Sequence, residues 1–242
     1  MRIGGSAATI IPSPVASDKW VQLRQSTVYD ALMRLPFLSW ALLVATVTGA
    51  DFLGYLQNGD AALPNGVFAI NLAMRLSTFS FLVLLAASVI LRARPTAKAR
   101  GVEPRLSALS GTFLIYAFAL FPRRELSPVA GIVSTLLILL GTASAAVVLS
   151  QLGRSFSIMA EARHLVTSGV YGFVRHPLYL AEELAAVGVA MQFLSYWTAL
   201  ILAVQIAFQL RRMRNEEAVL AETFPEYTAY SEQTARLIPG VY

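Results

Sequence analysis

The fold is decided by the stretch "PVAGIVSTLLILLGTASAAVVL", residues 128–149, which contains no charged side chain. About 20 consecutive apolar residues are enough for a helix to cross the roughly 30 Å hydrocarbon core of a bilayer. Its many Gly, Ala, Ser and Thr residues suit close packing between helices in lipid. The stretch therefore predicts a transmembrane helix that is buried among others.

Other apolar runs lie on both sides of it, at residues 36–56, 66–91, 106–121 and 178–210. The last run is longer than one crossing requires. The segment "FLSYW", residues 193–197, is suited to break it into a helical hairpin, and its Tyr and Trp are typical of the membrane interface. We therefore predict an all-α, multi-spanning protein of about five to six transmembrane helices, with six crossings placing both termini on one side.

Composition supports this class. The chain has 242 residues, of which 56% are hydrophobic and 14% charged, whereas soluble domains average about 25% charged residues. The net charge of +5 comes from short Lys and Arg clusters between apolar runs, which indicates loops facing anionic membrane lipids rather than nucleic acid. The absence of cysteine excludes disulfides and thiolate ligands, and two histidines argue against a metal site.

Basic residues also predict an orientation. Residues 92–105, 151–177 and the tail after 210 are rich in Arg, whereas residues 57–65 contain no Lys or Arg. The positive-inside rule puts the basic loops, both termini and the active site in the cytoplasm, with the protein in the cell inner membrane. Arg123 and Arg124 fall on the opposite side, which weakens the span at 106–121.

Three regions follow from this pattern. Residues 1–34 are predicted as a tail with a surface helix at 18–34, and residues 35–150 as a scaffold of about four transmembrane helices. Residues 151–242 interleave polar and apolar segments and carry the side chains capable of chemistry. We expect them to form the functional core.

Three polar features stand out in that core, and each allows a purely structural interpretation. "RHPLY", residues 175–179, is a Pro-started helix whose free backbone N–H groups could bind an anion or simply meet the headgroups. Glu182 and Glu183 lie in an apolar stretch, either in cytoplasmic water or facing a polar cavity. Arg212 and Glu216 are four residues apart, the spacing of a surface ion pair on a helix.

The order of the motifs is more specific than any one of them. "LVTSGVY" (residues 165–171), "RHPLY", an apolar hairpin, "RRMRNEEAVLAETFPEYTAY" (residues 211–230) and "RLIPG" (residues 236–240) follow one another. Over residues 151–242 this resembles the isoprenylcysteine carboxyl methyltransferase family, which is grouped with phospholipid methyltransferases. The resemblance implies an integral-membrane enzyme that uses S-adenosylmethionine.

The resemblance also implies roles for individual residues. Cofactor contacts fall on two motifs and on Glu216; the motif residues are Arg163, His164, Leu165, Val166, Tyr171, His176, Pro177, Leu178 and Tyr179. Arg212 and Glu216 become the catalytic pair, with Arg212 facing the substrate. The family's Phe-Gly-x-Glu-Tyr is shortened here to residues 224–227, and cofactor contacts around residues 157–161 stay unassigned.

The implied chemistry fits these residue types. Glu216 can bind the amino group of the cofactor, and His176 with the helix-start N–H groups its carboxylate. A carboxylate acceptor needs a cation, for which Arg212 is suited, and no base. An amine acceptor would instead need Glu182 or Glu183 as a base.

Several functions remain open at this stage. Carboxyl O-methylation of a lipophilic or prenylated acid leads, with phospholipid N-methylation and small-thiol S-methylation as alternatives. A non-catalytic transporter or scaffold is the alternative of another class. The expected partners are a lipophilic or lipid substrate and membrane lipids, and the sequence specifies no oligomeric state.

Overall fold

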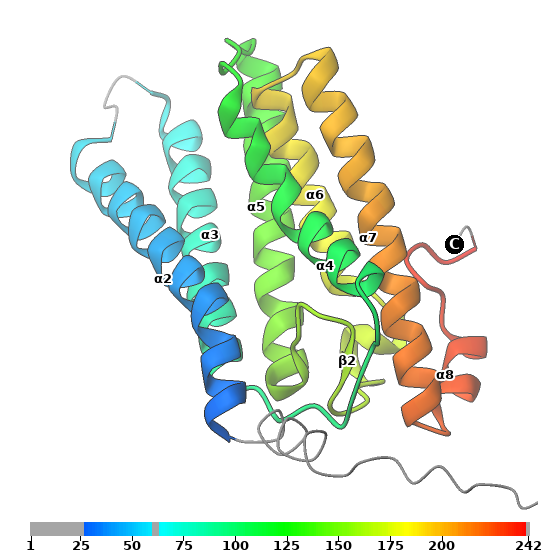
Figure 1. Ribbon diagram of the computed structural model, residues 1–242. Coiled ribbons are helices and arrows are strands. Elements are labelled where there is room, and N and C mark those ends of the chain that lie inside the picture. The colour runs from blue at the N-terminus through cyan, green and yellow to red at the C-terminus, as the bar shows by residue number, and fades with distance from the viewer. Residues whose placement is uncertain (1–26, 60–62, 241–242) are drawn as a thin grey trace, which may run out of the picture. The chain divides into compact units, whose positions relative to one another are not determined.

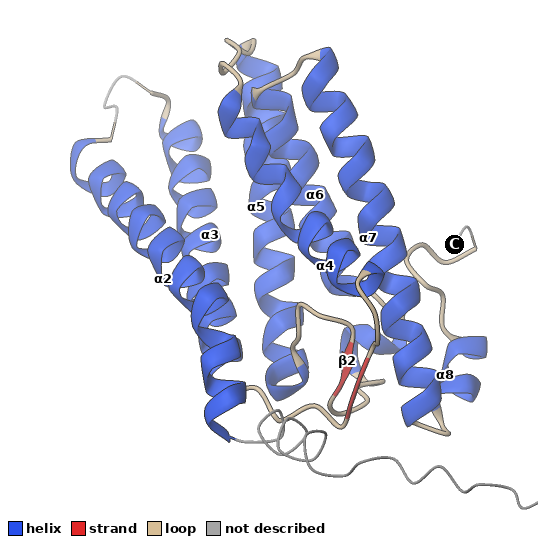
Figure 2. Cartoon of the chain, in the orientation of Figure 1, coloured by secondary structure: helices blue, strands red, loops and turns tan. Residues whose placement is uncertain are grey.

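The structure is a computed structural model that describes residues 27–59 and 63–240. Helices dominate this part of the chain, and the strands are two residues long (Figure 2). The helices are α2 (Thr27–Asn58), α3 (Asn65–Leu91), α4 (Glu103–Phe113), α5 (Pro128–Leu152), α6 (Pro177–Gln192), α7 (Tyr196–Thr223) and α8 (Tyr227–Gln233). The all-α prediction is therefore confirmed. The described residues from 38 onward form one compact unit.

The predicted apolar runs correspond well to helices. The run at 66–91 is α3 and the run at 128–149 is α5, which continues to Leu152. The run at 178–210 is divided as predicted: α6 ends at Gln192 and α7 begins at Tyr196. Ser195 caps α7, since its side chain accepts from the Thr198 N–H while the Thr198 side chain accepts from the Ser195 N–H.

Two boundaries differ from prediction. A surface helix at 18–34 was expected to precede the first span, but α2 begins at Thr27 and runs through Pro36 to Asn58, so residues 27–34 belong to the same helix. Residues 18–26 lie outside the described residues. The run at 106–121 starts as α4 and tightens into the 3₁₀ helix η1 (Leu114–Leu120).

Small residues allow α5 and α6 to pack closely. A Cβ atom on Gly141 would lie 2.5 Å from the Ala185 nitrogen, and one on Gly188 would lie 2.8 Å from the Ser134 carbonyl oxygen. The Ser134 hydroxyl donates to the Gly188 carbonyl at 2.8 Å. The small residues of the opening stretch therefore serve the close helix packing that the sequence predicted.

The loops at one end of the compact unit are tied together. β1 (Ala97–Lys98) pairs antiparallel with β2 (Glu161–Ala162), joining the α3–α4 connection to the α5–α6 connection. The segment after α8 forms a parallel bridge to the residues before α6, between Val174 and Ala235. Figure 1 shows β2, α8 and the loop before α4 at the same end of the unit, so segments far apart in sequence meet there.

Within residues 27–59 and 63–240, three helical segments are long and apolar enough to cross a membrane: Asp30–Asn58, Asn65–Leu91 and Pro128–Ser155. α6 has 16 residues and spans only about 24 Å at 1.5 Å per residue. α7 carries charged side chains in its second half. The prediction of six crossings, and that of the orientation, therefore stay predictions.

Candidate functional site

A pocket opens where the loops and helix ends meet. Its wall comes from the end of α5, the loop before α6, the C-terminal half of α7 and α8. The lining residues are Leu152, Ser155, Glu161, His164, Leu165, Val166, Tyr171, Arg175, His176, Glu216, Leu220, Tyr227 and Tyr230. Its enclosed interior measures about 50 Å³, below the roughly 300 Å³ of a small-molecule site. A ligand the size of a nucleoside would therefore also occupy the open mouth.

Six of the residues predicted to bind a cofactor line this pocket: His164, Leu165, Val166, Tyr171, His176 and Glu216. Pro177, Leu178 and Tyr179 do not line it, but are buried in the first turn of α6 directly after it. Arg163 is buried behind the wall, where its guanidinium bonds the Ala93 carbonyl and the Glu161 carboxylate. From this position Arg163 supports the loop before α6 and does not line the pocket.

Tyr179 connects the pocket to Arg212. Its hydroxyl donates to Glu216 Oε2 at 2.7 Å, and its ring stacks on His176 with centroids 5.4 Å apart. On the ring of Tyr179 lies the Arg212 guanidinium, with its central carbon 4.7 Å from the centroid. An anion in the pocket wall and a cation outside it are therefore held by one tyrosine.

Arg212 is buried among neutral partners. Its Nη1 donates to Thr112 Oγ1 at 3.1 Å and to Gln209 Oε1 at 3.4 Å, and its Nη2 to the Ser157 carbonyl at 3.5 Å. Its side-chain Nε is buried and has no hydrogen-bond partner among the described residues. Arg212 is only 4% exposed, so the surface ion pair with Glu216 considered from the sequence is wrong.

The neighbouring Arg211 shows what a surface pair looks like here. Its Nε lies 2.7 Å from Glu103 Oε1, and the side chains of the two residues are 54% and 49% exposed. The hydrogen bond from Arg211 lowers the pKa of Glu103. Adjacent arginines on α7 therefore serve different purposes.

Glu182 and Glu183 do not lie in open water. Gln209 Nε2 donates to Glu182 Oε2 at 3.2 Å, and Gln205 Nε2 donates to Glu183 Oε1 at 2.8 Å. The two carboxylates point to different residues, as expected for neighbours on a helix, yet both partners belong to α7. The acidic pair therefore faces a polar interior between helices.

The residues directly before α6 have occupied N–H groups. The N–H of Arg175 donates to the Ala235 carbonyl at 2.8 Å, and the N–H of His176 to the Arg236 carbonyl at 3.1 Å. Proline at position 177 has no N–H. The prediction that helix-start N–H groups bind the cofactor carboxylate therefore concerns residues 178 and 179 of α6, and it stays a prediction.

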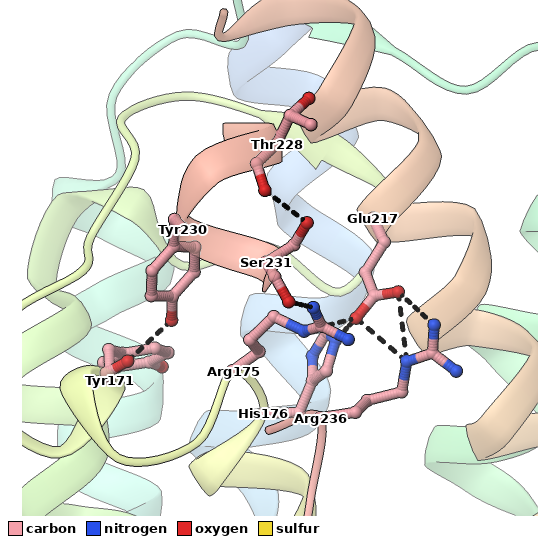
Figure 3. Close-up of polar contacts among 8 residues, drawn as sticks. All are labelled: Tyr171, Arg175, His176, Glu217, Thr228, Tyr230, Ser231 and Arg236. Atoms are coloured by element: carbon pink, nitrogen blue, oxygen red, sulfur yellow. Dashed lines mark hydrogen bonds and ion pairs between the residues drawn. The ribbon is translucent and has the colours of Figure 1, made fainter. Parts of the chain in front are cut away.

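Glu217 is the centre of a cluster that holds the segment after α8 (Figure 3). Its carboxylate lies 3.0 Å from His176 Nε2 and 3.1 Å from Arg175 Nε, and accepts from Arg236 Nε at 3.0 Å. Burial alone would raise the pKa of Glu217, but the hydrogen bonds from His176 and Arg236 and the charge of Arg175 lower it to about 2. Arg175 also donates to the Ser231 carbonyl of α8.

Sequence reasoning missed Glu217, Tyr227 and Tyr230. Glu217 is adjacent to the predicted Glu216, and only the approximately 100° turn between neighbours on a helix separates their roles. Tyr230 donates to the Tyr171 carbonyl at 2.6 Å, and burial raises its pKa to about 12. Tyr227 lines the pocket with its buried hydroxyl unpaired among the described residues. The "PEYTAY" motif, residues 225–230, carried the signal for both tyrosines.

The wall residues fit an adenosylated amino acid. The Glu216 carboxylate suits its ammonium group. The Tyr227 hydroxyl, which has no partner among the described residues, can donate a hydrogen bond to the ligand or accept one from it. Apolar Leu152, Leu165 and Leu220 offer surface for a base or ribose carbons. Among the residues that the structure describes, no cluster of His, Cys, Asp or Glu is placed to hold a metal ion.

Comparison with known proteins finds a family match and partial relatives. The model of the isoprenylcysteine carboxyl methyltransferase family matches residues 133–222. The chain is 34% identical over 80 residues to the nickel-cobalt-cadmium resistance protein NccN of Alcaligenes xylosoxydans xylosoxydans, which covers 33% of this chain and 38% of that protein. It is 36% identical over 76 residues to the cobalt-zinc-cadmium resistance protein CzcN of Cupriavidus metallidurans, covering 31% and 35%.

A third relative is the protein-S-isoprenylcysteine O-methyltransferase of Schizosaccharomyces pombe, 34% identical over 96 residues, which cover 37% of this chain and 41% of the relative. The match thus spans well under half the length of each of these relatives. The range matched by the family model includes α6 and most of α7. The stretch that matches the model of the isoprenylcysteine carboxyl methyltransferase family, residues 133–222, carries much of the pocket wall together with Arg212 and Glu216.

Proposed function

We propose that this protein is a membrane methyltransferase that uses S-adenosylmethionine and methylates the carboxylate of a lipophilic acid. The observation that carries the proposal is the Glu216–Tyr179–Arg212 arrangement. In the wall of the pocket, the Glu216 carboxylate accepts from the Tyr179 hydroxyl. Arg212, a buried and incompletely paired cation, lies over the ring of the same tyrosine. The family match and the three apolar helices support the same conclusion.

S-adenosylmethionine would supply an electrophilic methyl group on a sulfonium, with a neutral thioether as the leaving group. The pocket residues would hold and orient it: Glu216 at the ammonium group, Tyr227 as a hydrogen-bonding partner, and residues 164–166 along the wall. Tyr179 keeps the Glu216 carboxylate in place through its 2.7 Å hydrogen bond. These residues align reactants, which is the main contribution a protein makes to a transfer of this kind.

Arg212 holds the acceptor. A buried guanidinium whose described partners are neutral retains its full charge and a free N–H, both of which a carboxylate satisfies. A carboxylate is ionised at neutral pH, so no proton has to be removed before attack. An amine acceptor would be repelled in its ammonium form by the same cation. The arrangement therefore favours carboxyl O-methylation over phospholipid N-methylation.

The lipophilic character of the acceptor follows from the surroundings. Arg212, on α7, contacts Thr112 at the end of α4. The half of α7 that precedes Arg212 is largely apolar. The loop 153–176 lines the pocket together with the second half of α7, the helix that carries Arg212. A water-soluble cofactor and an acid dissolved in the membrane would therefore meet at Tyr179.

The test uses the purified full-length protein in detergent micelles with methyl-labelled S-adenosylmethionine. Three acceptors of equal chain length are offered: a fatty acid, the corresponding primary amine and the corresponding thiol. Label should enter the acid and leave the amine and thiol unlabelled. Transfer to the amine or thiol in place of the acid, or no transfer to any of them in a folded sample, would contradict the proposal.

A further inference from the structure

Polar side chains continue beyond Arg212 into the apolar interior. Gln205, Gln209 and Arg212 are spaced four and three residues apart on α7 and so share one face, which we name the α7 polar stripe. They are 4%, 1% and 4% exposed. Glu182 and Glu183 bond to the stripe from α6. Polar groups buried in apolar surroundings are costly, so a stripe of this length indicates a function.

The inner end of the stripe has two acceptors without a donor. Gln205 Nε2 donates both to the Gly111 carbonyl at 2.9 Å and to Glu183 Oε1 at 2.8 Å. Because both partners are acceptors, the orientation of the amide is fixed, and its oxygen must point elsewhere. Gln205 Oε1 and Glu183 Oε2 are buried and have no hydrogen-bond partner among the described residues.

We infer that Glu183 and Gln205 form a binding site for a hydrogen-bond donor, an O–H or N–H group, carried by the apolar chain of the methyl acceptor. This inference rests on the proposed function, because it assumes that the acceptor carboxylate lies at Arg212. Gln205 is seven residues from Arg212, which is about 10 Å along a helix. The substrate class is therefore lipophilic acids with a hydroxyl or amide N–H about 10 Å from the carboxylate.

One extended molecule along α7 would satisfy both ends of the stripe. Its carboxylate would meet the unpaired Nε of Arg212, and its donor would meet the unpaired oxygens of Gln205 and Glu183. An acid without the donor would cover these oxygens and leave them unpaired. Sites that hydrogen-bond a ligand group discriminate strongly against the analogue that lacks it, for this reason.

Two other arrangements would satisfy the same oxygens without a ligand. A neutral Glu183 could give its own proton to Gln205 Oε1, or a water molecule could bridge the two oxygens. In both cases the oxygens are already paired when the acceptor arrives. The protein would then bind an acid with a donor and an acid without one equally well.

The experiment compares hexadecanoic acid with its mid-chain hydroxy derivative, whose hydroxyl lies about 10 Å from the carboxylate. Equilibrium binding of each labelled acid is measured on the full-length protein in detergent micelles. The hydroxy acid should bind about tenfold more tightly, the ratio expected for one hydrogen bond to an otherwise unpaired buried group. Equal affinities would overturn the inference.

The double variant Gln205→Met, Glu183→Met removes both acceptors at similar volume, and the affinity ratio should fall to about one. Gln192→Met is the matched control, because Gln192 lies at the far end of α6 and bonds Ser134 Oγ at 3.1 Å, away from the stripe; it should keep the tenfold ratio. A double variant that retains the ratio would overturn the inference. If this variant does not fold, the two wild-type affinities still decide.

Methyl transfer to both acids is measured in parallel, which separates the two proposals. Preferential binding of the hydroxy acid without methyl transfer would support the donor site and contradict the proposed function. Methyl transfer to both acids at equal kcat/KM with equal affinities would contradict the donor site alone.

Discussion

Two arginines in this protein lie over tyrosine rings, and they differ in what completes their surroundings. The guanidinium carbon of Arg75 in α3 lies 4.0 Å from the Tyr55 ring centroid, and that of Arg212 in α7 lies 4.7 Å from the Tyr179 centroid. Arg75 also forms a 2.9 Å ion pair with Asp51. Arg212 has only neutral hydrogen-bond partners among the described residues.

The difference separates a structural arginine from one available to a ligand. The Asp51 side chain is 61% exposed, so the charge of Arg75 is balanced by a carboxylate on the surface of the protein. Arg212 is buried, and the carboxylates near it are bonded to other groups: Glu216 to Tyr179 and Glu182 to Gln209. A buried cation to which no anion is directly bonded is costly to the fold, and an anionic substrate would lower that cost.

The largest effect is expected at Arg212. Arg212→Ala should lower kcat/KM for a lipophilic acid by about a hundredfold or more, since a charge-assisted, bidentate contact is lost. Arg212→Lys keeps the charge but loses the planar fork, and should lower it by well over tenfold. Initial rates with labelled cofactor measure both.

Arg211→Lys is the matched control, because the adjacent side chain forms only an exposed pair with Glu103. It should change kcat/KM less than about twofold. A Lys variant at 212 that is as active as this control would remove Arg212 from the mechanism and make it equivalent to Arg75.

The second effect concerns Glu217, which neutralises Arg175 and Arg236 as Asp51 neutralises Arg75. Glu217→Gln should destabilise the protein by about 2 kcal/mol near neutral pH, because hydrogen bonds to a charged group are lost. The pKa of Glu217 is about 2 in the fold against an ordinary value of 4.5. Its ionised form is thus the one that the fold stabilises.

This contribution is present in full above about pH 4.5 and is lost as the pH falls from about 4.5 to about 2. Thermal unfolding in detergent from pH 7 to pH 3 should therefore show a steeper acid decline for the wild type than for Glu217→Gln. Parallel declines would show that Glu217 does not hold the C-terminal segment through its charge.

A smaller effect is expected from Tyr179→Phe, which keeps the ring under Arg212 and removes only the hydroxyl bonded to Glu216. Cofactor affinity should fall about three- to tenfold, as for the loss of one hydrogen bond that positions a charged group. The KM for the acid acceptor should change little, since the cation–ring contact is retained. A change in acceptor KM larger than that in cofactor affinity would place the hydroxyl on the acceptor side.

The smallest effect is expected at Arg75. Arg75→Lys should keep an ion pair with Asp51 and leave kcat/KM within about twofold of wild type, with a stability change of less than about 1 kcal/mol. Circular dichroism melts and initial rates test this. A large loss of activity in a well-folded Arg75→Lys protein would mean that Arg75, like Arg212, contributes to activity and is not only structural.

The sequence predicted the helices well because each apolar run contains its own signal. The runs that became α3 and α5, and the break between α6 and α7, are local properties of composition and capping. The uninterrupted α2 was missed because a surface helix at 18–34 and a span at 36–56 were predicted as separate segments, whereas α2 runs through Pro36. Proline is tolerated within helices of membrane proteins more often than in soluble ones.

Six of the residues predicted to bind a cofactor line one pocket, but the contacts of the candidate site could not be predicted. Arg212 and Glu216 have the spacing of an ion pair, yet their partners, Thr112 and Tyr179, come from other helices and lie 100 and 37 residues away. The N–H groups of Arg175 and His176, directly before α6, bond the carbonyls of residues 235 and 236, and nothing in "RHPLY" indicates this. Partners at such separations are decided by tertiary packing, which local spacing does not report.

The central claim is that the pocket binds S-adenosylmethionine through Glu216. Equilibrium binding of the labelled cofactor to the purified full-length protein in micelles tests it most directly. Wild type should bind saturably, Glu216→Gln should bind at least about tenfold more weakly, and Glu222→Gln, an exposed control on the same helix, should bind as wild type does. Absence of saturable binding in folded protein, or normal binding by Glu216→Gln, would contradict the account.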